Sequence, residues 1–338
     1  MSRLKIGVIG VGRIGKIHSE NISRFIPQAQ LEGIADIILS TEQEDWAKSL
    51  GARIITKDPE DLLKDPSIDA IAICSSTDTH ADFIIAAAQA GKQIFCEKPI
   101  DLTVDKVKAA LGAVKKAGLK LQIGFNRRFD HNFARIREYT LAGKIGDVHL
   151  VKISSRDPAP PPPAYVAVSG GIFLDMMIHD FDMARFQAGS EVVEVYAVGA
   201  VLVDPEIGKA GDVDTALVTL KFANGAIGVI DNSRKAVYGY DQRVEVFGSA
   251  GAAMADNDVP NTVKHFHEAG VTGEKPLYFF LERYKGAFID EMAAFVYAIQ
   301  NNKPVPVTGE DGLADMYVAL AAGKSLKEGR PVKIDEVK

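Results

Sequence analysis

Hydrophobic residues in the first 124 positions form short runs separated by longer segments with helical spacing. The runs are four to seven residues long and rich in isoleucine and valine, which favours buried strands. Between them, apolar residues recur every three or four positions, which favours helices, as at residues 13–23, 81–90 and 104–117. This alternation predicts a doubly wound parallel sheet of the α/β class. The expected strands are residues 5–9, 30–35, 52–56, 70–74, 93–96 and 120–124.

The pattern changes after Arg128 and predicts a second domain. A proline run at 158–163 favours extended geometry, so it forms either a rigid loop near a site or a contact arm to another subunit. Asn224-Gly225 between apolar runs predicts a hairpin in a strand-rich stretch, 192–254. We expect an α+β domain with a largely antiparallel open sheet over 125–338, after a Rossmann domain over 1–124. The other expected elements are helices 131–142, 171–187, 281–300 and 311–326 and strand 147–155.

A glycine loop follows the first strand directly. Gly10, Gly12 and Gly15 fit the G-x-G-x-x-G pattern, in which the glycines allow a tight turn, close approach of a pyrophosphate and close helix–strand packing. The helix that follows would point its free N–H groups and positive dipole end at the phosphates. Since a strand precedes the loop and a helix follows it, nucleotide binding is favoured over an ordinary turn.

Asp36 ends the second expected strand, 21 residues after Gly15. A carboxylate in that place bonds the adenosine ribose hydroxyls in dinucleotide-binding domains. The next residues, 37–40, are Ile-Ile-Leu-Ser and contain no cation to neutralise a 2′-phosphate. We therefore expect NAD rather than NADP as the cofactor.

Charge and composition limit the classes of partner. The net charge is −6, which leaves no basic surface for nucleic acid. No apolar run has the length of a membrane helix, and the N-terminus has no signal-peptide core, so a cytoplasmic protein without membrane contact is expected. Cys74 and Cys96 show neither metal nor disulfide spacing and are expected to be core thiols.

Polar residues follow two neighbouring strands of the first domain. Ser75, Thr77 and His80 come after one strand, and Glu97 and Lys98 come after the next. Ligands of parallel α/β sheets bind beyond the carboxyl ends of the strands. Lys98 is therefore placed where a hydride-transfer enzyme needs a cation beside a substrate hydroxyl.

Asp175 and His179 lie four residues apart in the expected helix 171–187 and would share one of its faces. A histidine beside a carboxylate holds a defined tautomer and takes up a proton near neutral pH, which the oxidation of an alcohol requires. The alternative is an ion pair on a helix surface. Asp180 and Asp182 also suggest a metal, but with one histidine and no second cluster we expect none.

The combination of motifs resembles one family. A G-x-G-x-x-G opening, Glu97-Lys98-Pro99 after a later strand, and Asp175-x-x-x-His179 in the second domain resemble the Gfo/Idh/MocA oxidoreductases over nearly the whole chain. The residues at 160–165, including four prolines, depart from typical members. Three segments are most similar to the inositol 2-dehydrogenases of the family: 155–158, 169–175 and 237–244.

The resemblance implies NAD-dependent oxidation of myo-inositol to 2-keto-myo-inositol. It implies that Lys98 lowers the pKa of the reacting hydroxyl, that His179 is the general base and that Asp175 bonds a neighbouring hydroxyl. Glu97 would lie near the nicotinamide ribose. The implied partners of the remaining hydroxyls are Arg128, Asp157 and Tyr238. The expected cofactor-binding residues are Gly10, Gly12, Arg13, Ile14, Asp36, Ser75, Thr77, His80, Glu97 and Lys98.

Each implied substrate contact has an alternative. Arg128 could be a surface cation, Asp157 could cap a turn before a proline, and either Tyr238 or Tyr240 could be a core residue. His18 is expected to be a packed or surface residue without a catalytic role.

Other functions also fit the pattern. The protein could oxidise another sugar or polyol, such as scyllo-inositol, an aldose or a sugar acid, or cleave glycosides with NAD. It could also be an inactive nucleotide-binding regulator, although a sensor has no use for Lys98, Asp175 and His179. The open sheet offers a broad face for self-association, so a homo-oligomer is expected, with a tetramer favoured.

Overall fold

A computed structural model describes residues 2–338, which form two compact units. The first unit holds the chain up to Phe129 together with Gly286–Ala314, and the second holds Asp130–Lys285 and Asp315–Lys338. The sequence led us to expect a change of domain after residue 124 and did not indicate the return of 286–314 to the first unit. Along residues 2–338, no helix combines the length and apolar character needed to cross a bilayer.

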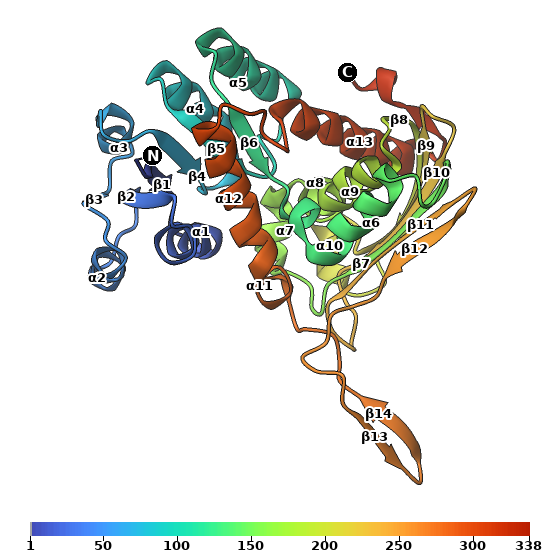
Figure 1. Ribbon diagram of the computed structural model, residues 1–338. Helices are drawn as coiled ribbons and strands as arrows, with labels where there is room; N and C mark the ends of the chain where they lie inside the picture. The colour runs from blue at the N-terminus through green and yellow to red at the C-terminus, as the bar shows by residue number, and fades with distance from the viewer. Residues whose placement is uncertain (1) are drawn as a thin grey trace. The chain divides into compact units, whose positions relative to one another are not determined.

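Six parallel strands form the sheet of the first unit (Figure 1). Their order across the sheet is β3-β2-β1-β4-β5-β6, which is the doubly wound order of dinucleotide-binding domains. The expected parallel α/β fold is therefore confirmed. The strands are β1 (Leu4–Ile9), β2 (Ala29–Ala35), β3 (Ile54–Thr56), β4 (Ala70–Ile73), β5 (Gln93–Glu97) and β6 (Leu121–Gly124).

A helix from late in the chain completes the core of the first unit. Met292, Phe295 and Val296 of α12 (Lys285–Gln300) are fully buried in one cluster with residues of β1, β2 and α1. Phe295 packs edge-on against Phe95 of β5, with 5.9 Å between ring centroids. The other helices of this unit are α1 (Arg13–Arg24), α2 (Thr41–Ser49), α3 (Glu60–Lys64), α4 (Thr77–Gln89) and α5 (Val104–Ala117).

The second unit is built on a seven-stranded sheet in the order β12-β11-β7-β10-β9-β8-β15. All neighbours are antiparallel except β7 and β10, so the largely antiparallel sheet is confirmed. Asn224-Gly225 turns β9 into β10, as expected, with Gly225 at φ +90°. The strands are β7 (Val148–Arg156), β8 (Val192–Ala200), β9 (Thr215–Phe222), β10 (Ile227–Ser233), β11 (Asp241–Gly248), β12 (Gly251–Ala255) and β15 (Val332–Lys333).

Helices α6 (His131–Leu141) and α9 (Ile178–Ala188) lie on one face of this sheet (Figure 1). On the strands, buried and exposed residues alternate, as in β9, because successive side chains point to opposite faces. A separate exposed hairpin, β13 (Lys264–His267) and β14 (Gly270–Gly273), was not expected from the sequence. The remaining helices are α10 (Pro205–Lys209), α11 (Phe280–Arg283) and α13 (Gly309–Glu328).

The single helix expected over 171–187 is wrong. The chain forms α7 (Pro163–Ser169), α8 (Gly171–Asp175) and α9 instead. The N–H groups of Met176 and Met177 both donate to the carbonyl of Ile172, at 3.1 and 2.8 Å, which widens the turn and ends α8. Asp175 is therefore the last residue of one helix, and His179 lies in the first turn of the next.

Candidate active site

The glycine loop leaves room and donors for an anion. A Cβ on Gly10, whose φ is +87°, would lie 2.6 Å from the backbone of Ser75, and one on Gly15 would lie 1.8 Å from the carbonyl oxygen of Gly10. A Cβ on Gly12 would meet no heavy atom within 4 Å. No side chain caps the first N–H groups of α1. The open space at Gly12 and the uncapped helix fit a dinucleotide pyrophosphate.

Asp36 ties the end of β2 to this loop. Its Oδ2 accepts a hydrogen bond from the Val11 N–H at 2.7 Å, and its Oδ1 accepts one from the Ile38 N–H at 2.9 Å. Each carboxylate oxygen has a second lone pair that remains available to a ribose hydroxyl. The neighbouring side chains of Ile37 and Ile38 are exposed and uncharged.

The polar residues after β4 are joined to the end of β5 by a buried histidine. His80 has one ring nitrogen 2.8 Å from the Pro99 carbonyl oxygen and the other 3.0 Å from that of Ser75. The Ser75 hydroxyl lies 2.7 Å from that of Thr79. Thr77 begins α4. The structure thus brings Ser75 and His80 together with the Glu97-Lys98-Pro99 segment.

Glu97 ends β5 and Lys98 follows it, both half-buried. Glu97 Oε1 lies 2.7 Å from Nε2 of His18, which is fully buried on α1. Glu291, fully buried on α12, places its Oε1 3.8 Å from the same nitrogen. Burial raises the pKa of Glu291 well above its usual range, and the nearby Glu97 carboxylate acts in the same direction. His18 therefore holds Glu97 in place, beside a second acid that favours its protonated form.

Arg128 belongs to the first unit, in the single turn η1 (Asn126–Phe129) after β6. Its Nη2 donates to Asp311 Oδ1 at 3.0 Å, and its side chain is 11% exposed. Arg128 is thus a largely buried, ion-paired residue, which differs from the open surface cation considered as its alternative.

In the second unit, two donors hold the carboxylate of Asp175. The Tyr165 hydroxyl donates to Oδ1 at 2.8 Å, and Arg234 Nη1 donates to Oδ2 at 3.0 Å. Asp157 Oδ2 lies 4.0 Å from the same Arg234 nitrogen. The structure thus brings Asp157 and Asp175 together around a buried guanidinium. His179 is half-buried, and the next residue, Asp180, is fully buried.

Tyr238 follows β10, and its hydroxyl bonds two charged residues. It donates to Asp241 Oδ2 at 2.6 Å and accepts from Arg156 Nη1 at 2.9 Å. Burial, with help from Asp241, raises the pKa of Tyr238. The phenol oxygen keeps one lone pair for a further donor. Tyr240 is the core residue of the two, since it is 4% exposed and packs edge-on against Tyr284 at 6.0 Å.

Two profiles of known families match this sequence. Residues 4–125 match the oxidoreductase family with an NAD-binding Rossmann fold, Gfo/Idh/MocA, and residues 133–254 match a Gfo/Idh/MocA C-terminal domain. The chain is 52% identical over 334 residues to the myo-inositol 2-dehydrogenase of Thermotoga maritima, a match that covers 99% of both chains. This protein belongs to the Gfo/Idh/MocA oxidoreductase family. The resemblance seen in the sequence motifs is thereby confirmed.

Other Gfo/Idh/MocA relatives extend the comparison. The inositol 2-dehydrogenase of Rhizobium meliloti is 46% identical over 332 residues, covering 98% of this chain and 99% of the relative. The crystal structure of scyllo-inositol dehydrogenase from Lactobacillus casei, with bound NAD(H) and scyllo-inositol, superposes with a TM-score of 0.90 at 34% identity. That match covers 99% of this chain and 100% of the other. The first unit is an NAD-binding Rossmann domain, as the glycine loop predicted.

Sequence reasoning missed three residues of this Gfo/Idh/MocA site region. Arg234 had no signal, because it is a lone cation after a strand. Tyr165 lies in the segment that departs from typical members, and its contact with Asp175 depends on the break between α7 and α8. Glu291 is far from Glu97 in the chain, so only the fold brings the two together. His18 was expected to be packed, and it is, but as the partner of Glu97.

Two clusters among residues 2–338 offer three metal-ligating side chains each. One is the His18–Glu97–Glu291 group, and the other joins Asp130, His131 and Asp258. In the second cluster, the Arg283 guanidinium pairs with both aspartates. A fixed positive charge disfavours a cation there.

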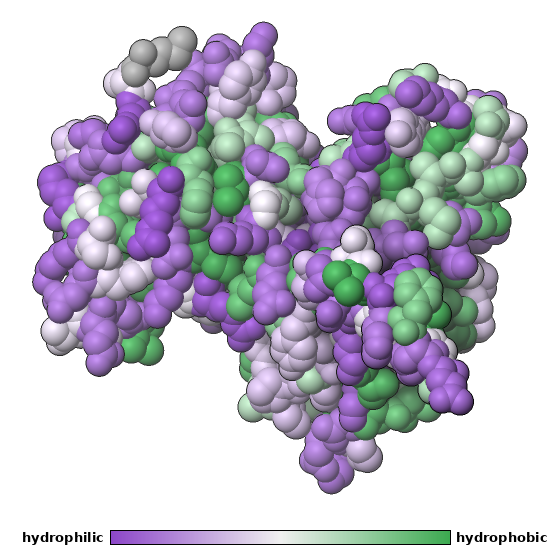
Figure 2. All heavy atoms as spheres, turned by 60° about the horizontal axis from the view of Figure 1, so that its bottom comes forward, coloured by the Kyte–Doolittle hydropathy of each residue, from purple (hydrophilic) through white to green (hydrophobic). Residues whose placement is uncertain are grey.

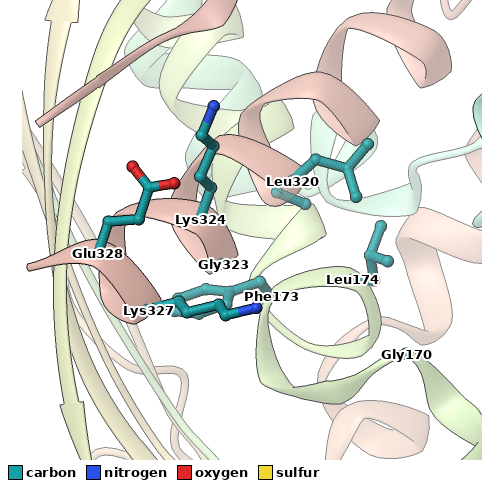
Figure 3. Close-up of a pocket in the computed structure, with 9 residues that line it drawn as sticks. Gly170, Phe173, Leu174, Leu320, Gly323, Lys324, Lys327 and Glu328 are labelled. Carbon is teal, nitrogen blue, oxygen red and sulfur yellow. The ribbon is translucent and has the colours of Figure 1, made fainter. Parts of the chain in front are cut away.

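A groove of about 450 Å³ in the second unit contains none of the expected site residues (Figure 3). Phe173 and Leu174 of α8 face Leu320 of α13, and Lys327 and Glu328 stand at its edge (Figure 3). Its apolar walls offer few partners to a substrate covered with hydroxyls. The polar residues around Asp175 and Lys98 are the better candidate for the active site of this Gfo/Idh/MocA protein.

Proposed function

We propose that this protein oxidises myo-inositol to 2-keto-myo-inositol with NAD. The observation that carries the proposal is 52% identity, along 99% of both chains, to a protein named myo-inositol 2-dehydrogenase. The cluster of Asp157, Asp175, Arg234 and Tyr165 supports it, because a ring with a hydroxyl on every carbon needs several fixed hydrogen-bond partners.

The residues of the chain divide the work of moving the proton. The Lys98 ammonium lowers the pKa of the reacting hydroxyl through its charge. Neutral His179 accepts the hydroxyl proton as general base. Asp175 accepts a hydrogen bond from the adjacent hydroxyl, which orients the ring. Arg128, Asp157 and Tyr238 bond the remaining hydroxyls.

The first unit holds the cofactor. When bound, NAD supplies the acceptor for the hydride that leaves the ring carbon. The open space at Gly12 and the uncapped N-terminus of α1, opened by Arg13 and Ile14, bind the pyrophosphate. Asp36 accepts from the ribose hydroxyls. Around the nicotinamide we propose Ser75, Thr77, His80, Glu97 and Lys98.

A related substrate is the second candidate. The scyllo-inositol 2-dehydrogenase (NAD(+)) of Bacillus subtilis is 37% identical over 337 residues, and the two inositols differ at one ring carbon. The same residues would serve either ring, so the choice depends on which face of the reacting carbon carries the hydrogen.

The deciding experiment is initial NADH production from myo-inositol, scyllo-inositol, glucose and galactose under identical conditions. We expect the highest catalytic efficiency with myo-inositol. A clear preference for glucose or galactose would overturn the inositol assignment. Steady NADH formation with a free polyol also separates a dehydrogenase from a regulator and from a glycoside-cleaving enzyme.

We also propose a cytoplasmic homotetramer. The face of the second sheet opposite α6 and α9 carries exposed apolar side chains: Val198, Leu217, Ile227, Phe247 and Met254. Figure 2 shows hydrophobic side chains gathered among hydrophilic ones at the right of the view. Apolar patches of this kind on a sheet favour self-association.

A further inference from the structure

Arg234 is a buried cation in the second unit. Its side chain is 3% exposed, and it follows β10, where its N–H donates to the Asp214 carbonyl at 2.8 Å. A buried charge is tolerated only when an opposite charge compensates its lost hydration. The guanidinium obtains that compensation from Asp175, 3.0 Å from Nη1, and from Asp157, 4.0 Å from the same atom.

The second oxygen of Asp175 is held from the other side. The Tyr165 hydroxyl donates to Oδ1 at 2.8 Å, from α7. One donor on each oxygen fixes the plane of the carboxylate, which would otherwise rotate about its last torsion. Each oxygen retains acceptor capacity, since an ionised carboxylate has about four lone-pair sites.

A third carboxylate shares the positive charge. Asp212 Oδ1 accepts from the Ile172 N–H at 3.1 Å, at the start of α8. Burial raises the pKa of Asp212; the Asp175 charge adds to that effect, and the Arg234 charge opposes it. Arg234 therefore offsets the mutual repulsion of three aspartates: Asp157, Asp175 and Asp212.

We propose that Arg234 is a positioning residue that, together with Tyr165, fixes the ionised carboxylate of Asp175 so that it accepts a hydrogen bond from a ring hydroxyl of the substrate. The inference rests on the proposed function and extends it to two residues that touch the reaction through Asp175. Without the guanidinium, Asp175 would gain a proton or rotate, and the ring hydroxyl beside the reacting carbon would lose its acceptor.

Steady-state kinetics of Arg234→Gln, Arg234→Lys and Tyr165→Phe test the proposal. A hydrogen bond to a charged group corresponds to roughly 10–100-fold, so we expect Arg234→Gln to raise the KM for myo-inositol by at least ~10-fold. The KM for NAD should change by less than ~2-fold, because Arg234 holds Asp175 and not the cofactor site. Arg234→Lys keeps the charge but not the guanidinium fork, so it should recover part of the loss.

The matched control is Arg330→Gln. Arg330 is also ion-paired, to Glu336 at 2.7 Å, but it is 45% exposed and outside the site. It should leave both KM values unchanged. If Arg234→Gln changed the two KM values equally, or lowered only the melting temperature, Arg234 would be a structural residue and the proposal would be wrong.

The Asp175→Asn background identifies the route of the effect. If Arg234 acts through Asp175, Arg234→Gln should cost less than ~2-fold in kcat/KM once Asp175 is already changed. Full additivity would overturn the proposal. If the unmodified protein prefers another polyol, the proposed substrate falls, and the same cycle is measured with that polyol. If it oxidises none, melting temperatures replace rates, and additive losses would equally overturn the pairing.

Discussion

The carboxylate of Asp36 is oriented by two backbone N–H groups, those of Val11 and Ile38. A 2′-phosphate beside it would be repelled, since the neighbouring Ile37 and Ile38 bring no positive charge. Repulsion of about 1.4 kcal/mol is a tenfold change, so we expect the kcat/KM with NAD to exceed that with NADP by at least ~10-fold.

Asp36→Ala should narrow that gap, chiefly by weakening NAD, because the ribose hydroxyls lose their acceptor. The control is Asp45→Ala on α2, an exposed aspartate paired with Lys48 at 3.0 Å. Equal efficiencies with the two cofactors in the unmodified protein would contradict this reading of Asp36.

His179 and Lys98 are predicted to serve the chemical step and not cofactor affinity. His179→Ala and Lys98→Ala should each lower kcat by ~10²-fold or more, the usual size of a general acid–base contribution. NAD affinity, followed by calorimetry, should stay nearly unchanged. The oxidation rate of the unmodified enzyme should rise with pH, since neutral imidazole is the form that accepts a proton. A normally active His179→Ala variant would shift the role of base to Asp175.

At the scale of elements, α1, β5 and α12 meet at the His18–Glu97–Glu291 group. The raised pKa of Glu291 means that the folded protein binds its proton more tightly than the unfolded chain does. Stability therefore falls as pH rises from the ordinary range of a glutamic acid through the raised pKa. Glu291→Gln keeps the shape of the protonated acid and removes the titration.

We expect the Glu291→Gln variant to melt at a higher temperature than the unmodified protein at pH 8, with the difference shrinking towards pH 5. Differential scanning calorimetry across this range measures it. Glu310→Gln, at an exposed position at the start of α13, is the control and should leave the pH dependence unchanged. Parallel pH curves for Glu291→Gln and the unmodified protein would mean that Glu291 is ionised in the fold.

At the scale of the whole molecule, the exposed face of the second sheet is predicted to bury itself against another copy. Leu217 and Val198 are paired neighbours on that face, each 44% exposed. Leu217→Asp would place a charge in the interface and should shift the molecular mass measured by light scattering to a smaller species. Leu141→Asp, an exposed position at the end of α6, should leave the mass unchanged. A monomeric unmodified protein would contradict the tetramer.

The sequence was sufficient for the first unit because buried parallel strands leave long apolar runs and a glycine loop has strict steric needs. It was less informative for the second unit. Met176 and Met177 keep the helical period, so nothing in the pattern marked the turn between α8 and α9. The contacts of Asp175 with Tyr165 and Arg234 depend on that turn and on the end of β10, which are tertiary features. Glu291 was missed for the same reason.

The return of residues 286–314 to the first unit has a consequence for protein synthesis. When Phe129 leaves the ribosome, the core around Phe95 still lacks Met292, Phe295 and Val296. At the usual rates of translation, the intervening 130–285 segment takes roughly 10 to 30 s to make. During that interval the nascent Rossmann domain exposes an apolar surface that only α12 covers. Chaperone binding to ribosome-attached chains should therefore persist until α12 has emerged and cease soon afterwards.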